Sequence, residues 1–447
     1  MSAPRAIASA PLAGRARAAV LPVLARRARR LLDHEGAWSA AAQALASGMS
    51  FVVSILAARL LGVAEFGQFV LILAGVFIVG TLQYQVVSGP MMTVAGLRRR
   101  SDAYYGAVTR WLILVSLLSG LAIAAYVLAL TGWQTGRARL DLALAGFTVG
   151  IGIVLHDGLK RILFAHHRPR AAFAFEALRY GLFALAAGLG WLLFGVSAAG
   201  LLFCVGLAPI VVALPMLAPR LRAVPRRRLK RIVLGRHWRI GRWMALMVLV
   251  SLAHEHVVTI AAGMMLGDWA AAGLRAGQIL FGPILMLMMS LENFVPRQAA
   301  ERLRAGGRPA LAAYLRRVFL LGGLPVAGFC LTVAIFEDPL LHLLLGPAFT
   351  AFDEVVTVMA VAPTLILARE LGMIYLRTVG ETRGVFMAFA ASSVISIVLL
   401  VPLIRGWGVV GAAAAFALGH ALSTTLVIAR AWRGARGTAA VAGEPVP

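Results

Sequence analysis

The segment that decides the fold is 218–242, APRLRAVPRRRLKRIVLGRHWRIGR, which holds ten of the chain's 43 lysine and arginine residues. On either side lies a long apolar region, 37–217 before it and 243–432 after it. Basic loops of membrane proteins stay on the cytoplasmic side. The pattern therefore predicts two membrane-embedded halves joined by a basic cytoplasmic linker.

The composition of the whole chain supports this interpretation. Of 447 residues, 61% are hydrophobic and the mean hydropathy is +0.87, whereas soluble domains are roughly 45–50% apolar. The formal net charge is +25, yet charged residues make up only 14% of the chain. This low share argues against a disordered basic protein and against a large soluble catalytic domain on a membrane anchor. The hydrophobic and the basic residues must be segregated in space.

Twelve apolar stretches are long enough to cross a bilayer core, which takes about 20 helical residues. They are continuous and apolar on all sides, which favours helices over the alternating strands of a barrel. The stretches are 37–58, 66–94, 106–131, 140–156, 172–194, 196–217, 243–265, 269–291, 318–336, 354–376, 384–404 and 408–429. We predict an all-α polytopic membrane protein with about twelve transmembrane helices in two six-helix bundles.

Basic residues fall almost entirely on one side of the predicted membrane. If the N-terminus is cytoplasmic, 35 of the 43 lie in cytoplasmic segments, four in outer loops and four within spans. The four outer residues are Arg59, Arg137, Arg139 and Arg405. The positive-inside rule then places both termini in the cytoplasm. This requires an even number of spans and favours twelve over eleven, the count obtained if the fifth and sixth stretches are one.

An internal repeat relates the two halves at an offset of 213 positions. Segment 195–203, GVSAAGLLF, aligns with 408–416, GVVGAAAAF, and Arg170 aligns with Arg383. Because six spans separate the copies, both start on the same side, and the repeat is parallel. It predicts a pseudo-two-fold axis along the membrane normal.

We expect five regions and no cleaved signal peptide, because the first 36 residues contain no continuous apolar run. Leucines among the arginines of this segment fit a helix on anionic lipids of the cytoplasmic leaflet, and a disordered basic tail fits equally well. The regions are a basic cytoplasmic segment 1–36, a bundle 37–217, a linker 218–242, a bundle 243–432 and a short tail 433–447.

The sequence contains no signature of an enzyme or of a cofactor. Cys204 and Cys330 lie in separate halves and are expected to be packing residues. His254 and His256 flank Glu255, but two positions on a helix are about 200° apart, so they do not form a metal site. There is no nucleotide-binding glycine loop, nucleophile elbow or paired-carboxylate motif. Topology explains the basic pI, so we expect no nucleic-acid partner.

Ionisable residues inside the spans are the candidates for function, because each is costly if it faces lipid. Arg110, Arg179 and Arg369 lie at a similar inner depth and would form a cationic vestibule if they face inward together; Arg275 lies in the outer third of its span. We therefore predict substrate binding by these four arginines. Simpler roles stay open, since Arg179 can pair with Glu176 three positions before it and Arg110 can reach the headgroups.

Glu255 lies near the middle of the seventh span, between His254 and His256. A carboxylate at this depth can exchange a proton or bind a cation, with its histidine neighbours tuning it. We predict a coupling role for these three residues. A structural hydrogen bond between helices is the alternative.

Six short motifs resemble the polysaccharide transporter family of the multidrug/oligosaccharidyl-lipid/polysaccharide exporter superfamily, which includes O-antigen and exopolysaccharide flippases. Their order covers the chain from about 40 to 430. They are ARLLGVAEFG at 58–67, LG to AGLRA at 266–276, VPR at 295–297, LGPAF at 345–349, the turn 377–383 and GWGVVGAA at 406–413.

The resemblance implies two bundles that open alternately to either side of a bacterial inner membrane. It implies an undecaprenyl-diphosphate-linked oligosaccharide as substrate, a cationic central cavity, and polysaccharide assembly proteins as partners. Such families often carry an acidic residue in span seven, where Glu255 lies. The alternatives are a multidrug or metabolite antiporter of the same superfamily, which would have an acidic cavity, and a sugar polymerase, which would have a large outer loop.

Overall fold

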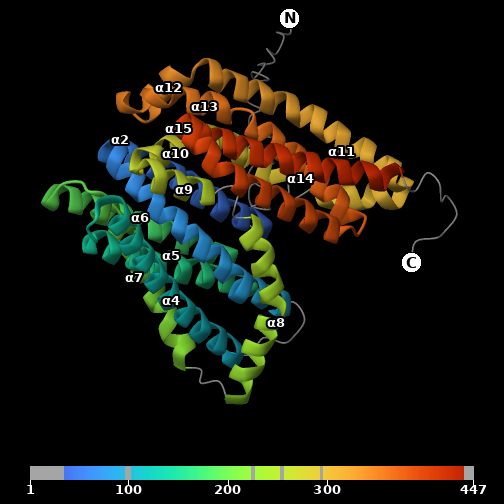
Figure 1. Cartoon of the computed structure of the whole chain (residues 1–447). Helices are drawn as coiled ribbons and strands as arrows, with labels where there is room; N and C mark the ends of the chain where they lie inside the picture. Colours follow the sequence, from blue (N-terminus) through green and yellow to red (C-terminus); the bar gives the residue numbers. More distant parts are fainter. Residues whose placement is uncertain (1–34, 96–101, 223–226, 252–255, 292–294, 437–447) are drawn as a thin grey trace, which may run out of the picture.

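The computed structural model describes residues 35–95, 102–222, 227–251, 256–291 and 295–436. All regular secondary structure in these ranges is helical. The predicted all-α fold of two bundles is confirmed: helices α2 to α7 form one bundle and α9 to α15 the other, with α8 between them in sequence (Figure 1). We call these the N bundle and the C bundle.

The N bundle consists of α2 (Glu35–Gln83), the π-helical turn η1 (Tyr84–Ser88), α3 (Gly89–Ala95), α4 (Asp102–Thr135), α5 (Leu140–Ala165), α6 (Pro169–Phe194) and α7 (Ala198–Arg222). Helix α8 covers Arg227–Ser251. The C bundle consists of α9 (His256–Leu266), α10 (Asp268–Leu291), α11 (Val295–Ile335), α12 (Glu337–Leu344), the 3-10 helix η3 (Pro347–Phe352), α13 (Asp353–Met359), α14 (Ala362–Thr378) and α15 (Thr382–Arg436).

The twelve predicted spans all fall on these helices. Eight helical stretches of the described chain are long and apolar enough to cross a membrane. Two of them, 57 and 51 residues long, each contain two predicted spans separated by a kink, at Gly62 in α2 and at Gly408 in α15. The two remaining predicted spans, 243–265 and 269–291, fall on α8–α9 and on α10.

The backbone repeats at the offset of 213 positions found in the sequence. Helices α5 and α14 end, and α6 and α15 begin, at positions 213 apart. Gly195 (φ 77) is matched by Gly408 (φ 59), and His167 (φ 53) by Gly380 (φ 84), so positive φ angles recur at equivalent turns. The fourth, fifth and sixth spans therefore share one backbone plan with the tenth, eleventh and twelfth.

Helices continue past two predicted boundaries at which charges were interpreted as the ends of spans. The fourth span was predicted to end at 156, but α5 continues through Asp157 and Lys160 to residue 165. The linker 218–242 was predicted as a loop, but α7 extends to residue 222 and α8 starts at 227. In α8, Val233, His237 and Gly241 are buried, at spacings of four. Four arginines are exposed, namely Arg231, Arg236, Arg239 and Arg242.

Helix α8 is attached to the N bundle along this buried face. A Cβ at Gly241 would lie 2.5 Å from the carbonyl oxygen of Gln85, so the two backbones approach closely. The hydroxyl of Tyr104 lies 3.2 Å from His237 Nε2. Burial lowers the pKa of His237 to about 4, so this imidazole is neutral at pH 7.

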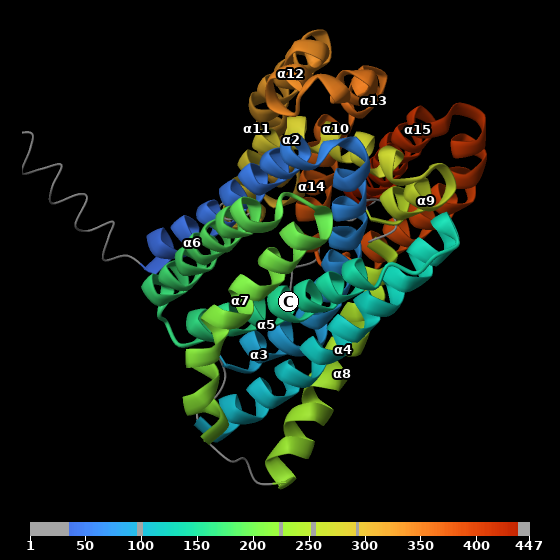
Figure 2. The ribbon, with the colours of Figure 1, turned by 90° about the vertical axis from the view of Figure 1, so that its left-hand side faces the viewer.

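Helices α2 and α10 form much of the contact between the bundles. They run antiparallel, since Ser54 contacts Arg275 and Phe51 lies beside Gly282. Gly67 lies against the backbone of Asp268, where a Cβ would clash with the carbonyl group. Figure 1 shows the bundles together at the end that holds α12 and the α9–α10 turn, and Figure 2 shows the same end from the side.

Candidate functional site

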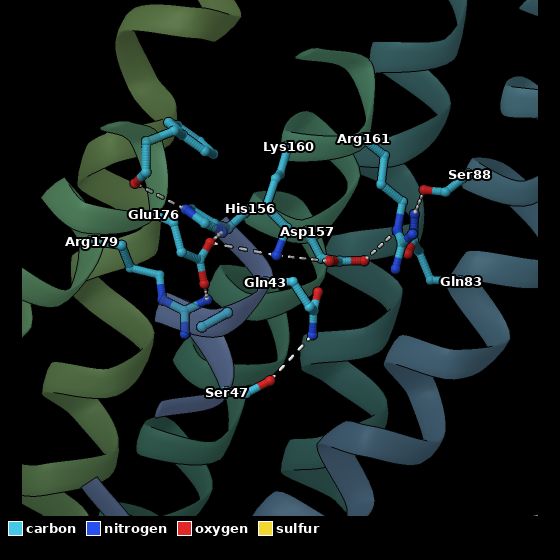
Figure 3. Close-up of polar contacts among 12 residues, drawn as sticks. Gln43, Ser47, Gln83, Ser88, His156, Asp157, Lys160, Arg161, Glu176 and Arg179 are labelled. Carbon is cyan, nitrogen blue, oxygen red and sulfur yellow. Dashed lines mark hydrogen bonds and ion pairs between the residues drawn. The ribbon is translucent and has the colours of Figure 1, made fainter. Parts of the chain in front are cut away.

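A cluster of ionisable side chains lies inside the N bundle, on facing surfaces of α5 and α6 (Figure 3). We call it the N cluster, and its members are His156, Asp157, Lys160, Arg161, Glu176 and Arg179. On α5 the charges recur at helical spacings of three and four, which brings them to one side of the helix. The cluster combines groups from both helices, with His156 and Glu176 buried at its centre.

Glu176 is the centre of the N cluster. Its side chain is 1% exposed, and three basic groups surround it: Lys160 Nζ at 3.5 Å, Arg179 Nη1 at 3.4 Å and His156 Nδ1 at 3.6 Å. Neither carboxylate oxygen has a hydrogen-bond partner in the described chain. Glu176 is therefore held by ion pairs slightly longer than hydrogen bonds.

His156 lies between two oxygen acceptors. Its Nε2 is 3.4 Å from the carbonyl oxygen of Phe175, and its Nδ1 faces Glu176 Oε2. A neutral imidazole donates from only one nitrogen. With Nε2 directed at the Phe175 carbonyl, Nδ1 faces Glu176 at 3.6 Å, beyond hydrogen-bond distance.

The N cluster extends to the π-helical turn of the second span. Asp157 accepts a hydrogen bond of 2.9 Å from Arg161, whose guanidinium lies 4.1 Å from the centre of the Tyr84 ring. Beside Tyr84, the Gln83 amide donates to Ser88 Oγ at 2.9 Å across η1. Turns of π-helix occur frequently at functional sites. The cluster and this irregular turn are thus in direct contact.

Sequence reasoning missed most of this cluster. It identified Glu176 and Arg179 as ionisable residues within a span, but it counted Lys160 and Arg161 as cytoplasmic charges. The spacing of Asp157 to Lys160 and Arg161, three and four positions, is the signal that indicates a continuing helix with internal pairs. The open alternative, that Arg179 pairs with Glu176, is what the structure contains.

The predicted substrate residue Arg179 also contacts its neighbour Tyr180. Arg179 Nη2 donates to the Tyr180 hydroxyl at 2.5 Å, and the guanidinium carbon is 4.3 Å from the ring centre. The hydroxyl donates to the carbonyl oxygen of Ala46 on α2 at 3.0 Å. Arg179 is therefore tied to α2 as well as to α6.

Arg369 belongs to a second cluster, in the C bundle, together with Glu370, Phe389 and His420, and we call it the C cluster. Arg369 Nη1 is 3.1 Å from His420 Nδ1, and Nη2 donates to Glu370 Oε1 at 3.0 Å. The guanidinium carbon lies 5.2 Å from the centre of the Phe389 ring. Arg369 is buried, whereas the side chain of Glu370 is 25% exposed.

Arg275 lies between the bundles. From α10 its Nη2 donates to Ser54 Oγ on α2 at 3.3 Å, and its Nη1 donates to Gln278 Oε1 at 3.2 Å. Both partners are neutral, and within the described residues it has no carboxylate partner. Arg275 thus brings to the contact between the two bundles a positive charge whose partners among the described residues are neutral.

Arg110 connects two helices of the N bundle. It donates to the carbonyl oxygen of Gly106 at 3.1 Å and to that of Leu221, in the last turn of α7, at 2.6 Å. The carbonyl groups at the end of a helix lack partners within it, so Arg110 caps α7. Each of the four predicted arginines therefore has its own set of partners.

Of the three predicted coupling residues, His254 and Glu255 lie outside the described residues. His256 is the first residue of α9, and its ring stacks on Phe77 of α2 at a centroid distance of 5.6 Å. It therefore lies at the contact between the bundles. No group of three metal-ligating side chains occurs in the described part of the chain.

Polar contacts close the bundles together at the predicted outer end. Arg59 donates to the carbonyl oxygens of Leu343 and Leu344 at the end of α12. The Gln134 amide donates to the carbonyl oxygen of Gly263 and to Asp268, each at 2.9 Å. These bonds join α2 and α4 to the C bundle on one side of the predicted membrane.

The fold is that of transporters of known structure. An inward-facing multidrug resistance MATE family transporter of the MOP superfamily matches with a TM-score of 0.67 at 14% identity, over 91% of this chain and 96% of that one. Lipid II flippase MurJ in an inward closed conformation matches with a TM-score of 0.69 at 11% identity, over 91% and 93% of the two chains.

An outward-facing MATE family transporter matches less well, with a TM-score of 0.56 at 14% identity, over 92% of this chain and 99% of that one. No protein-family model and no curated protein matches the sequence. The chain thus has the two-bundle fold of this class of membrane transporters. Of these three structures, the two inward ones have the higher TM-scores.

Proposed function

We propose that the chain is an inner-membrane flippase that moves an undecaprenyl-diphosphate-linked oligosaccharide to the outer leaflet by alternating access, for surface polysaccharide synthesis. The observation that carries the proposal is Arg275, a cation between the bundles whose partners in the described chain are neutral. A charge that is partly removed from water and has no counter-charge is costly. An anionic substrate that passes between the bundles would provide that counter-charge.

The pairing of the carboxylates in the two clusters supports an anionic rather than a cationic substrate. Among the described residues within the predicted bundles, Asp157, Glu176 and Glu370 are each paired with arginine or lysine. None of these three is left to bind a cationic drug. Arginine suits a diphosphate because its planar guanidinium binds phosphate oxygens in a bidentate manner.

The arrangement of the bundles fits an alternating-access cycle. Arg59 and Gln134 join the bundles at the predicted outer end, and opening of this end would expose Arg275 on that side. A substrate of net charge about −2 that moves outward gains roughly 4 to 5 kcal/mol per 100 mV of inside-negative potential. We propose that the potential drives transport, and that Glu255, His254 and His256 form the coupling site if a proton or cation is also required.

The test is translocation of a fluorescent undecaprenyl-diphosphate oligosaccharide in proteoliposomes that contain the full chain. We expect Arg275→Gln to slow translocation at least about tenfold, the effect of losing roughly 1.4 kcal/mol or more, and Arg275→Lys to retain part of the activity. Arg316→Gln, on the exposed side of α11, is the matched control and should behave as the wild type. Unchanged translocation in Arg275→Gln would refute the role of Arg275.

The competing function is a multidrug antiporter, favoured by the fold shared with MATE family transporters. It predicts cation-coupled efflux of a cationic dye and no movement of the lipid-linked oligosaccharide. Under that function, replacing Arg179 and Arg369 by glutamine would leave efflux intact. Running both substrates through the same proteoliposomes separates the two functions.

A further inference from the structure

A pocket of about 600 Å³ lies at the predicted outer end, away from both clusters. Trp133, from α4 of the N bundle, forms one side, and residues of the C bundle form the rest. These C-bundle residues are Met264, Met265, Leu266, Ile404, Arg405 and Gly408. The volume is within the range of about 300–1,000 Å³ typical of small-molecule sites.

Most of the pocket lining is apolar, and one cation lies among it. Arg405 is exposed and makes no hydrogen bond or ion pair with any residue that the structure describes. It differs in this from two other arginines of the predicted outer side, since Arg59 binds the end of α12 and Arg139 pairs with Asp141 at 2.6 Å. An unpartnered cation beside an apolar surface is complementary to an anionic amphiphile.

The position of the pocket indicates that this amphiphile is a membrane lipid. Trp133 and Trp407 are 72% and 66% exposed, and exposed tryptophans concentrate where headgroups meet hydrocarbon. Arg405 is next but one to Trp407 in the sequence. An arginine at this depth binds phosphate oxygens, while the methionines, leucine and isoleucine of the pocket accept an acyl chain.

We propose that this pocket binds an anionic glycerophospholipid, with its headgroup phosphate on Arg405 and its acyl chain along the apolar lining. The proposal goes beyond transport of the lipid-linked oligosaccharide and holds whether or not that function is correct. Trp133 also donates a hydrogen bond of 3.3 Å to the carbonyl oxygen of Met264 in the other bundle. Because both bundles form the pocket, the bound lipid stabilises the arrangement that is closed at the outer end.

The test is native mass spectrometry of the full chain in detergent with added phosphatidylglycerol. We expect Arg405→Gln to retain at least about threefold less phosphatidylglycerol than the wild type. Met265→Gln leaves the charge of Arg405 in place but makes the apolar lining more polar. It should also reduce the amount of phosphatidylglycerol retained. Arg137→Gln is the matched control, because Arg137 is an exposed arginine of the predicted outer side that does not line the pocket, and it should retain the wild-type amount.

Thermal unfolding provides a second readout, because a ligand that binds only the folded state raises Tm. Phosphatidylglycerol should raise the Tm of the wild type and of Arg137→Gln more than that of Arg405→Gln. Sodium phosphate is added alone as a separate probe. Equal retention in Arg405→Gln and wild type overturns the proposal, and so does an Arg405-dependent Tm shift given by sodium phosphate but not by the lipid.

Discussion

The N cluster and the C cluster lie at equivalent places in the two bundles but have different chemistry. At the offset of 213 positions, His156 corresponds to Arg369 and Glu176 to Phe389. In the N bundle a carboxylate with a 1% exposed side chain holds three basic groups. In the C bundle an aromatic ring occupies that place, and the arginine pairs instead with the more exposed Glu370.

The two halves of the repeat therefore share the course of the backbone but not the charged residues. Positive φ angles recur at Gly195 and Gly408, whereas the central carboxylate occurs in one bundle alone among the described residues. In a network of ion pairs inside a bundle, substituting one charged side chain leaves the remaining charges without a counter-charge, which destabilises the fold. The two bundles should therefore respond equally to a backbone change and unequally to a change of charge.

The largest effect is expected from Glu176→Gln. The substitution leaves Lys160 and Arg179 facing a neutral group in a buried place, and breaking a buried pair in this way costs about 3–5 kcal/mol. Thermal unfolding of the purified protein should show a marked fall in Tm. The double variant Glu176→Gln/Arg179→Gln should recover part of the loss, because Lys160 still has Asp157 at 3.5 Å. A Tm equal to the wild type in the single variant would show that the network is not stabilising.

The second-largest fall in Tm is expected from alanine at the turn glycines Gly195 and Gly408, and it should be similar in the two bundles. Gly195 (φ 77, ψ −173) and Gly408 (φ 59, ψ −134) adopt backbone conformations that other residues avoid, and nothing lies within 4 Å of a Cβ at either position. Alanine therefore adds strain without a clash, at about 1–3 kcal/mol for each. We expect Gly195→Ala and Gly408→Ala to lower Tm by similar amounts.

Gly328→Ala is the control for these two variants, since Gly328 lies within a helix and a Cβ there also meets open space. It should leave Tm unchanged or raise it slightly, because alanine favours helix. A large fall in Tm for only one of the two turn glycines would show that the two turns are not equivalent.

The removal of the C-cluster charge should cost less than that of Glu176. Arg369→Gln removes the ion pair with Glu370, but the Glu370 side chain is 25% exposed and water can solvate it. With the contact to His420 also lost, we expect a cost of about 1–2 kcal/mol. Chemical or thermal denaturation of both variants checks whether Glu176→Gln loses more stability than Arg369→Gln. A larger loss for Arg369→Gln would contradict the role of exposure in the difference.

Hydropathy and the distribution of basic residues were sufficient to predict the helical fold, because span length and loop charge are properties of sequence alone. The partners of charges within spans were not predictable in the same way. Asp157 and Lys160 have the charged character of a loop, and only the contact of Lys160 with Glu176 on another helix shows that they lie inside the bundle. Nor does the sequence reveal that Arg275 meets Ser54, since 221 positions separate them.

The smallest loss of stability is expected from substitution of Phe389, whose ring lies in the C bundle at the position that corresponds to Glu176 in the N bundle. Phe389 lies under the Arg369 guanidinium at 5.2 Å, and a cation–π contact of this kind is worth about 0.5–1 kcal/mol. Phe389→Leu should therefore lower stability by that amount beyond the loss of packing. A double-mutant cycle isolates the contact, because in the Arg369→Gln background the leucine substitution should cost only its packing term. An identical cost in both backgrounds would mean that Phe389 serves the bundle by packing alone, and the C cluster would then consist of Arg369, Glu370 and His420.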